Sequence, residues 1–141
     1  FGSSEPSFAV MAQLILYVAD TDNHRVVRWD PGATEGVVVA GGTGEGDGPS
    51  QLSIPCGVAL DLEGRLLVVD CGNARVMRYA TGSLEGELVA GGHGEGAALN
   101  QLDSPCGICV ALDGSLVIGD CANHRVVRWA PGAPEGVVVA G

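Results

Sequence analysis

Short apolar runs of strand length, without a sustained helical periodicity, dominate this sequence. They occupy residues 14–19, 66–69 and 116–118, where apolar side chains follow one another without interruption. Because successive side chains of a strand point to opposite faces of its sheet, such a run indicates a strand that is buried on both sides. The pattern therefore predicts β-sheets that are each covered on both faces.

The polar and glycine-containing stretches between these runs divide the chain into short strands. In the central third of the chain we expect strands at 57–60, 65–69, 75–79 and 87–90. A Pro-Gly pair opens the last turn in the two other thirds, at Pro31-Gly32 and Pro131-Gly132, and this pair suits the middle of a type II turn. The spacing predicts four antiparallel strands in each unit.

The units repeat with a period of 50 residues. The stretch Asn23–Trp29 returns at Asn73–Tyr79 and at Asn123–Trp129, and 18 of the 22 positions in 20–41 are identical in 120–141. Glycine-rich connectors at 41–53 and 91–104 join the units. Repeated four-stranded sheets that cover one another describe a β-propeller. We predict an all-β chain of three propeller blades at about 6–41, 54–91 and 104–141, fewer than the four to eight blades of a closed ring.

The repeat also resembles a known family. Two stretches resemble the NHL repeat. One is Tyr17-Val18-Ala19-Asp20 followed by residues 22–26, and the other is residues 55–59, which are followed by Asp70 and residues 73–76. The sequence departs from that pattern in residues 1–13 and at Ala74, where the family has histidine. The resemblance implies about six blades in a complete ring, of which this chain would supply half. It also implies a partner-binding surface at the end of the propeller that carries the connectors.

Charge and hydropathy exclude several classes of partner. The net charge is −10, and six of the seven cationic side chains, all arginines, lie in the repeated stretch. Acidic residues are spread through the turns, which disfavours contact with a phosphate backbone or an anionic lipid surface. The apolar run at 8–19 is too short to span a bilayer and is interpreted as two buried strands. We expect neither nucleic acid nor a membrane as a partner.

An acidic residue and an arginine flank the same four-residue turn in every unit. The expected pairs are Asp20 with Arg25, Asp70 with Arg75, and Asp120 with Arg125. We interpret each pair as a staple across its turn, in which the asparagine adopts the left-handed conformation. Three equivalent copies favour a structural role over a catalytic one.

Histidines and carboxylates give weak signals for chemistry. His24 and His124 occupy equivalent positions, and His93 lies beside Glu95 in a connector. Histidines that face a propeller channel could hold a metal, but two of these lie away from the expected innermost strand. Residues 44–48 lack the ligand spacing of a calcium loop. We expect no catalytic residue, no metal site and no cofactor.

The cysteines favour disulfides within the blades. Cys56 and Cys71 fall opposite each other in the predicted hairpin, Cys106 and Cys121 repeat the arrangement, and the first unit has neither partner. Each bond would contribute roughly 3 kcal/mol and would place the protein in a secreted or lumenal compartment. Buried thiols or a metal site with four thiolates are the alternatives. Cys109 is expected to be a small core residue.

Three blades leave two sheet faces open, each about 300 Å² in flat projection. We expect further blades, a second copy or other subunits to cover them. The favoured function is a non-enzymatic scaffold for protein–protein interaction; the alternative is a propeller enzyme of the lyase or lactonase type with metal ligands on other blades. RNA binding is disfavoured by the acidic loops. The candidate partner-binding residues are Glu45, Asp47, His93, Glu95 and Asp103.

Overall fold

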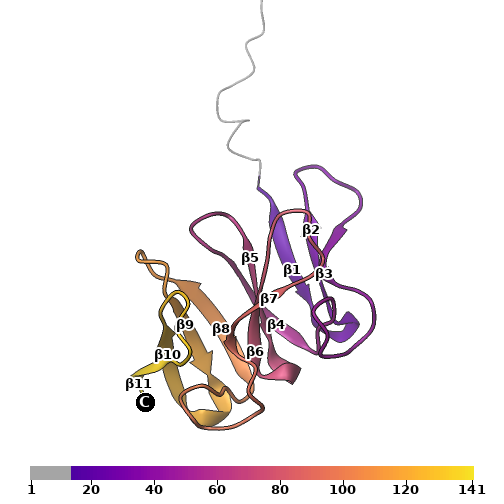
Figure 1. Cartoon of the computed structure of the whole chain (residues 1–141). Helices are drawn as coiled ribbons and strands as arrows, with labels where there is room; N and C mark the ends of the chain where they lie inside the picture. Colours follow the sequence, from indigo (N-terminus) through magenta and orange to yellow (C-terminus); the bar gives the residue numbers. More distant parts are fainter. Residues whose placement is uncertain (1–13) are drawn as a thin grey trace, which may run out of the picture.

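The computed structural model describes residues 14–141, which form three antiparallel sheets arranged side by side like the blades of a fan (Figure 1). We call these sheets blades 1, 2 and 3 in chain order. Their strands are β1 (Leu16–Asp20), β2 (Arg25–Trp29) and β3 (Val37–Gly41) in blade 1; β4 (Pro55–Leu60), β5 (Leu66–Asp70), β6 (Arg75–Tyr79) and β7 (Glu87–Gly91) in blade 2; and β8 (Pro105–Val110), β9 (Leu116–Asp120), β10 (Arg125–Trp129) and β11 (Val137–Ala140) in blade 3.

Strand order follows chain order in every blade, so each blade is an antiparallel meander. The predicted four strands are present in blades 2 and 3, within one or two residues of the expected bounds. Blade 1 has three described strands, and its expected first strand falls within residues 1–13, outside the described residues. No helix of the described part is long and apolar enough to cross a membrane.

The turns have the geometry that their residues favour. Gly32 and Gly132 both have a φ of 72°, as glycine permits after proline, and the amides of Ala33 and Ala133 donate across these turns. Gly64 has a φ of 81° and closes the turn between β4 and β5 by donating to Asp61. The order of strands and turns therefore follows directly from the repeated sequence.

Two apolar layers hold the three blades together. We call the side of a blade that points toward the preceding blade its front face, and the side that points toward the following blade its rear face. In blade 2 the front face is formed by Leu66, Val68, Met77 and Tyr79, and the rear face by Leu67, Val69, Val76 and Ala90. All eight are buried, because blade 1 covers one face and blade 3 covers the other. Strand β5 is buried at every position, as its uninterrupted apolar run predicts.

Each connector contributes a leucine to these layers. Leu52 lies between blades 1 and 2, Leu102 lies between blades 2 and 3, and both are fully buried. Sequence reasoning missed this role, although the Gln-Leu pair at 51–52 returns at 101–102. A buried leucine ties each connector to the core, so that the connector is part of the folded structure.

The outermost blades show where the sequence expectation of burial was wrong. The run at 14–19 was expected to be buried, yet Leu14, Leu16 and Val18 are 69%, 55% and 45% exposed. Leu16 and Val18 occupy the front face of blade 1, which no described residue covers. A strand can therefore have the sequence of a core strand and still be open on one side where the neighbouring blade is absent.

Candidate functional site: the connector end

A buried carboxylate organises the end of blade 2 at which the connector arrives. Asp70, the last residue of β5, is completely buried. Its Oδ1 accepts the backbone N–H of Ser53 at 2.7 Å, while its Oδ2 accepts Nδ2 of Asn73 and Nε of Arg75, both at 2.8 Å. A buried carboxylate is stable only when charge and hydrogen bonds compensate its lost hydration, and here both are supplied. Asp70 therefore joins a strand, a turn and the incoming connector.

Arg75 extends this network into the connector. Its Nη1 donates to the carbonyl oxygen of Asp47 at 2.9 Å, and its Nη2 donates to those of Gly48 and Gln51 at 3.1 and 3.0 Å. The side chain of Asn73 adds a 2.8 Å bond to the carbonyl of Gly46. The planar guanidinium, with five donors in a fixed arrangement, can hold several carbonyls at once. One arginine thus fixes the course of a glycine-rich loop.

Blade 3 repeats the arrangement. Asp120 is also completely buried, and its Oδ1 accepts the backbone N–H of Asp103 at 2.7 Å. Arg125 donates through Nε to Asp120 at 2.7 Å, and through its two Nη groups to the carbonyls of Ala97, Ala98 and Gln101. Equivalent residues thus hold both connectors at the same end of the molecule, which we call the connector end.

Blade 1 shows the same pair in a more open setting. Nε of Arg25 lies 2.7 Å from Oδ2 of Asp20, but the two side chains are 40% and 29% exposed, compared with 11% and 0% for the pairs in blades 2 and 3. The hydrogen bond from Arg25, followed by that from Asn23, lowers the pKa of Asp20 below its usual value. The three predicted staples are therefore all formed, and two of them are buried.

The turn between the paired residues differs from the expectation in one respect. Residues 21–23, 71–73 and 121–123 form single turns of 3₁₀ helix, labelled η2, η3 and η4. The left-handed residue is the one after the asparagine: His24, Ala74 and His124 have φ values of 52°, 49° and 52°. The expectation for asparagine was wrong: each asparagine is the last residue of its 3₁₀ turn, where its side chain donates to the aspartate, and the positive φ falls on the next residue.

His24 has a role that the sequence did not reveal. Its Nδ1 accepts the backbone N–H of Ile54 at 3.0 Å, and its Nε2 lies 3.6 Å from Oε2 of Glu45. The hydroxyl of Ser53 donates to Oε1 of the same glutamate at 2.8 Å. Because these partners lie at least 20 residues from His24 in sequence, no local pattern could have indicated the contact. His24 joins blade 1 to the first connector.

The candidate binding residues lie on this end of the molecule. Glu45, Asp47, His93 and Glu95 are exposed, and Asp103 is half-buried. In the second connector Asp103 occupies the position of Ser53, so a carboxylate faces Glu95 where a hydroxyl faces Glu45. The hydrogen bond with Asp103, and then the repulsion of like charges, raises the pKa of Glu95. The structure thus places acidic side chains on a framework of fixed loops.

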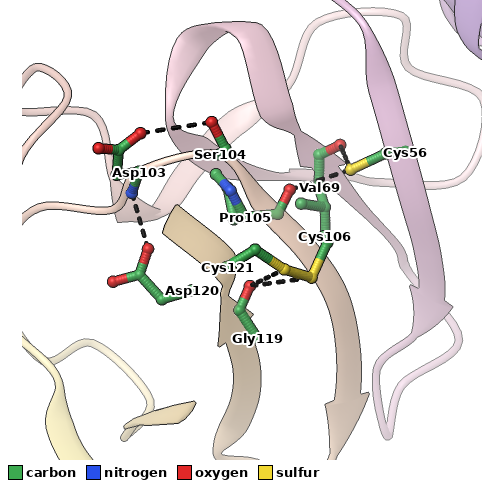
Figure 2. The surroundings of a disulfide bond; sticks show 9 residues. All are labelled: Cys56, Val69, Asp103, Ser104, Pro105, Cys106, Gly119, Asp120 and Cys121. Atoms are coloured by element: carbon green, nitrogen blue, oxygen red, sulfur yellow. Dashed lines mark hydrogen bonds between the residues drawn. A yellow bond between two sulfur atoms is a disulfide. The ribbon is translucent and has the colours of Figure 1, made fainter. Parts of the chain in front are cut away.

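The two cysteine pairs are in different states, and Figure 2 shows the bonded pair together with the nearby Cys56. Cys106 and Cys121 form a disulfide, with their Cα atoms 6.1 Å apart. Cys56 and Cys71, the second expected pair, are free thiols, and Sγ of Cys56 donates to the carbonyl oxygen of Pro105 at 3.0 Å instead. Burial, and then the neighbouring Cys71 thiol, raises the pKa of Cys56 to about 12. One predicted disulfide is present, while the other pair is reduced.

Cys109 was expected to lie in the core, and this expectation is wrong. The residue is exposed, although its equivalent in blade 2, Ala59, packs against the layer between blades 2 and 3. Cys109 lies on the rear face of blade 3, where no following blade covers it. A small side chain at the same position of the repeat is therefore packed against a neighbouring blade in blade 2 and exposed to solvent in blade 3.

Two grooves lie at the opposite end, between neighbouring blades. The groove between blades 1 and 2 has a volume of about 410 Å³ and includes Tyr17, Arg28 and Tyr79; the groove between blades 2 and 3 has about 340 Å³ and includes Arg65, Arg78 and Trp129. Within residues 14–141 no group of three or more His, Cys, Asp or Glu side chains is placed to hold a metal ion.

Comparison with known proteins identifies the architecture. No protein-family model matches the chain, and no curated protein is similar to it in sequence. Solved structures do match: an auxiliary nutrient binding protein from Bacteroides thetaiotaomicron, with a TM-score of 0.63 and 18% identity over 79% of this chain, and a gluconolactonase from Xanthomonas campestris, with a TM-score of 0.65 and 23% identity over 89% of this chain. These are β-propeller proteins. The chain has the β-propeller fold.

A third propeller similar to this chain is a catalytically inactive variant of virginiamycin B lyase from Staphylococcus aureus, solved with quinupristin, with a TM-score of 0.55 and 10% identity over 90% of this chain. The chain spans only 33% of the length of the nutrient binding protein, 43% of the gluconolactonase and 38% of the lyase. The three blades therefore correspond to less than half of each of these proteins.

Proposed function

We propose that this propeller segment is a non-enzymatic binding module of the NHL-repeat kind, and that its connector end receives a protein partner with a basic surface. The observation that carries the proposal is the way the two connectors are held. Buried Asp–Arg pairs fix their backbones, while the side chains of Glu45, Asp47 and Glu95 remain exposed. Fixed loops with exposed acidic side chains bind at a low cost in conformational entropy.

The chemistry of the partner follows from charge. The chain carries a net charge of −10, and its arginines in the repeated stretch are engaged with aspartates, glutamates or backbone carbonyls within the fold. A partner with exposed lysine or arginine would be attracted over the connector end, and electrostatic complementarity raises association rates and selects against acidic partners.

Titration calorimetry with a peptide of nine arginines tests this assignment. The variant Glu45→Gln/Asp47→Asn removes two charges from the connector end, and we expect it to bind about fivefold more weakly, because each exposed ion pair contributes about 0.5 kcal/mol. The matched control, Glu35→Gln/Glu63→Gln, removes two charges from the exposed turns between β2 and β3 and between β4 and β5. Equal weakening by both variants would show that only net charge matters, and the assignment to the connector end would then be wrong.

A second candidate is a propeller enzyme of the lactonase or lyase type, with its metal ligands on blades other than these three. The similarity in fold to a gluconolactonase and to a virginiamycin B lyase supports it. An assay of lactone hydrolysis distinguishes the enzyme from the binding module. It is run with added divalent cations on the longest natural polypeptide that contains this chain. Metal-dependent turnover that is lost on chelation would favour the enzyme.

A further inference from the structure

The front face of blade 1 has the residues of an interface but lacks a partner within the described chain. Leu16 is 55% exposed, whereas its equivalents Leu66 and Leu116 are 6% and 8% exposed. The same holds for Trp29, which is 36% exposed, while Tyr79 and Trp129 at equivalent positions are 2% exposed. The difference arises because blades 2 and 3 each have a preceding blade in the structure and blade 1 does not.

The rear face of blade 3 is open in the same sense. Ala140 is exposed, while its equivalents Ala40 and Ala90 are 0% and 2% exposed. Val126 is half-buried, although its equivalent in blade 2, Val76, is 0% exposed. The chain therefore presents one unused front face and one unused rear face, at opposite ends of the row of blades.

These two open faces carry the residues that already pack against each other inside the chain. The front face of blade 1 repeats that of blade 3, where Trp129 and Ile118 meet blade 2, with only Val18 in place of isoleucine: Leu16, Val18, Val27 and Trp29 correspond to Leu116, Ile118, Val127 and Trp129. The rear face of blade 3 shares Val126, Val139 and Ala140 with the rear face of blade 1, which has Val26, Val39 and Ala40, and it has Val117 where blade 1 has Tyr17. In both seams inside the chain, the aromatic residue of the front face, Tyr79 or Trp129, lies in the same apolar layer as a valine and an alanine of the rear face.

We propose that a second copy of this chain covers both open faces at once, so that two copies close a six-bladed ring. In this dimer the rear face of blade 3 in each copy packs on the front face of blade 1 in its partner. Such a head-to-tail contact forms a closed ring when its rotation closes, and six blades lie within the range of four to eight that propellers use. The assembly is independent of what the connector end binds.

The area of the contact favours a closed ring over a single seam. One blade face covers about 300 Å² in flat projection, so one seam buries about 600 Å², which is below the range of stable protein interfaces. Two seams in a closed dimer bury about 1,200 Å² in the same projection, at the lower limit of that range. Closure therefore gives a stable dimer where an open chain of copies would have only weak contacts.

Sedimentation equilibrium on the purified 141-residue chain tests the proposal. We expect a single species with twice the 14.2 kDa mass of one chain. The variants Val18→Asp and Ala140→Asp each place a charge on one open face, at positions that are exposed in the single chain, and should give folded monomers by circular dichroism. The control Leu112→Asp adds the same charge at a residue that is 98% exposed in a turn, and should remain dimeric.

Tryptophan fluorescence gives a second readout of the same seam. The variant Trp129→Tyr, which copies the residue of blade 2, leaves Trp29 as the only tryptophan. Its emission should shift to shorter wavelength as concentration rises through the dimerisation range, and this shift should be absent when Ala140→Asp is added. A monomeric wild-type chain, a ladder of larger species, or an unchanged Trp29 emission would overturn the proposal. A monomer that still binds the arginine peptide at the connector end would overturn the dimer and leave the proposed function standing.

Discussion

Nε of Arg75 donates a 2.8 Å hydrogen bond to Oδ2 of Asp70, whose carboxylate has no exposure to solvent. The same pair in blade 1, Arg25 with Asp20, has a similar geometry but lies partly in solvent. Because the strength of an ion pair depends on its surroundings more than on its distance, the two pairs should differ strongly in their contribution to stability.

Asp70→Asn should destabilise the fold severely. The substitution leaves the guanidinium of Arg75 buried without its counter-charge, which costs about 3–5 kcal/mol in the free energy of unfolding. Asp20→Asn, the matched change at the exposed pair, should have a much smaller effect. Urea denaturation of the two variants measures the difference. Equal loss of stability in both would mean that burial of the pair does not determine its contribution.

The leucine of each connector should be as important as a strand residue. Leu52→Ala removes a fully buried side chain between blades 1 and 2, and we expect a loss of about 2–5 kcal/mol in the free energy of unfolding. Leu99→Ala changes a leucine of the second connector that is 43% exposed, and should cost far less. Thermal unfolding compares the two. A tolerated Leu52→Ala would show that the first connector is not anchored to the core.

The reduced cysteine pair should close under oxidising conditions. Cys56 and Cys71 occupy the same register as the disulfide-bonded pair, since Pro55 faces Asp70 as Pro105 faces Asp120. The pKa of Cys56 is raised to about 12, so its thiol is protonated at neutral pH and its oxidation should accelerate as the pH rises. Peptide mapping by mass spectrometry after oxidation at pH 7 and pH 10 measures the bond.

Cys109 provides the control in the same experiment, because it has no partner in its hairpin and should still be alkylated by iodoacetamide when the oxidised chain is unfolded in guanidinium. A chain in which Cys56 and Cys71 stay alkylatable after prolonged oxidation at pH 10 would contradict the expected second disulfide.

The two carboxylates of the second connector should make stability depend on pH. The pKa of Glu95 is raised, first by its hydrogen bond with Asp103, so the folded chain holds this proton more tightly than the unfolded chain does. The resulting stabilisation is complete below the unfolded pKa of a glutamate, about 4.3, and is lost as the pH rises through the folded pKa. Asp103→Ser, which copies the first connector, should lower the pKa of Glu95. Carbon-detected NMR titration measures it, and an unchanged midpoint would rule out the coupling.

The repeat explains how much of this fold could be predicted from sequence. Strand positions, the Asp–Arg pairs and the Pro-Gly turns depend on local spacing, and the 50-residue period repeats them in each unit. Burial of the outermost blades could not be predicted in the same way. Val18 and Cys109 have the character of core residues, and only the absence of a neighbouring blade exposes them.

Contacts between residues far apart in the chain also could not be predicted from the sequence. His24 accepts a hydrogen bond from a residue 30 positions away, and Arg75 reaches carbonyls 24 to 28 positions before it. The sequence pattern indicates Arg75 only as the partner of Asp70. Its three further hydrogen bonds depend on the connector folding back over the turn, and they make the pair a support for the connector as well as for the turn.

The buried Asp–Asn–Arg clusters hold the connectors rigid. Native-state hydrogen exchange at two amides tests it most directly, because the N–H of Ser53 and the N–H of Asp103 donate to Asp70 and Asp120, each at 2.7 Å. Both amides should be protected as strongly as those of the central strands, and a mildly destabilised Asn73→Ala variant should lose protection at Ser53 while Asp103 keeps it. Exchange of both amides at the rate of an unfolded peptide in the wild-type chain would show that the clusters do not hold the connectors.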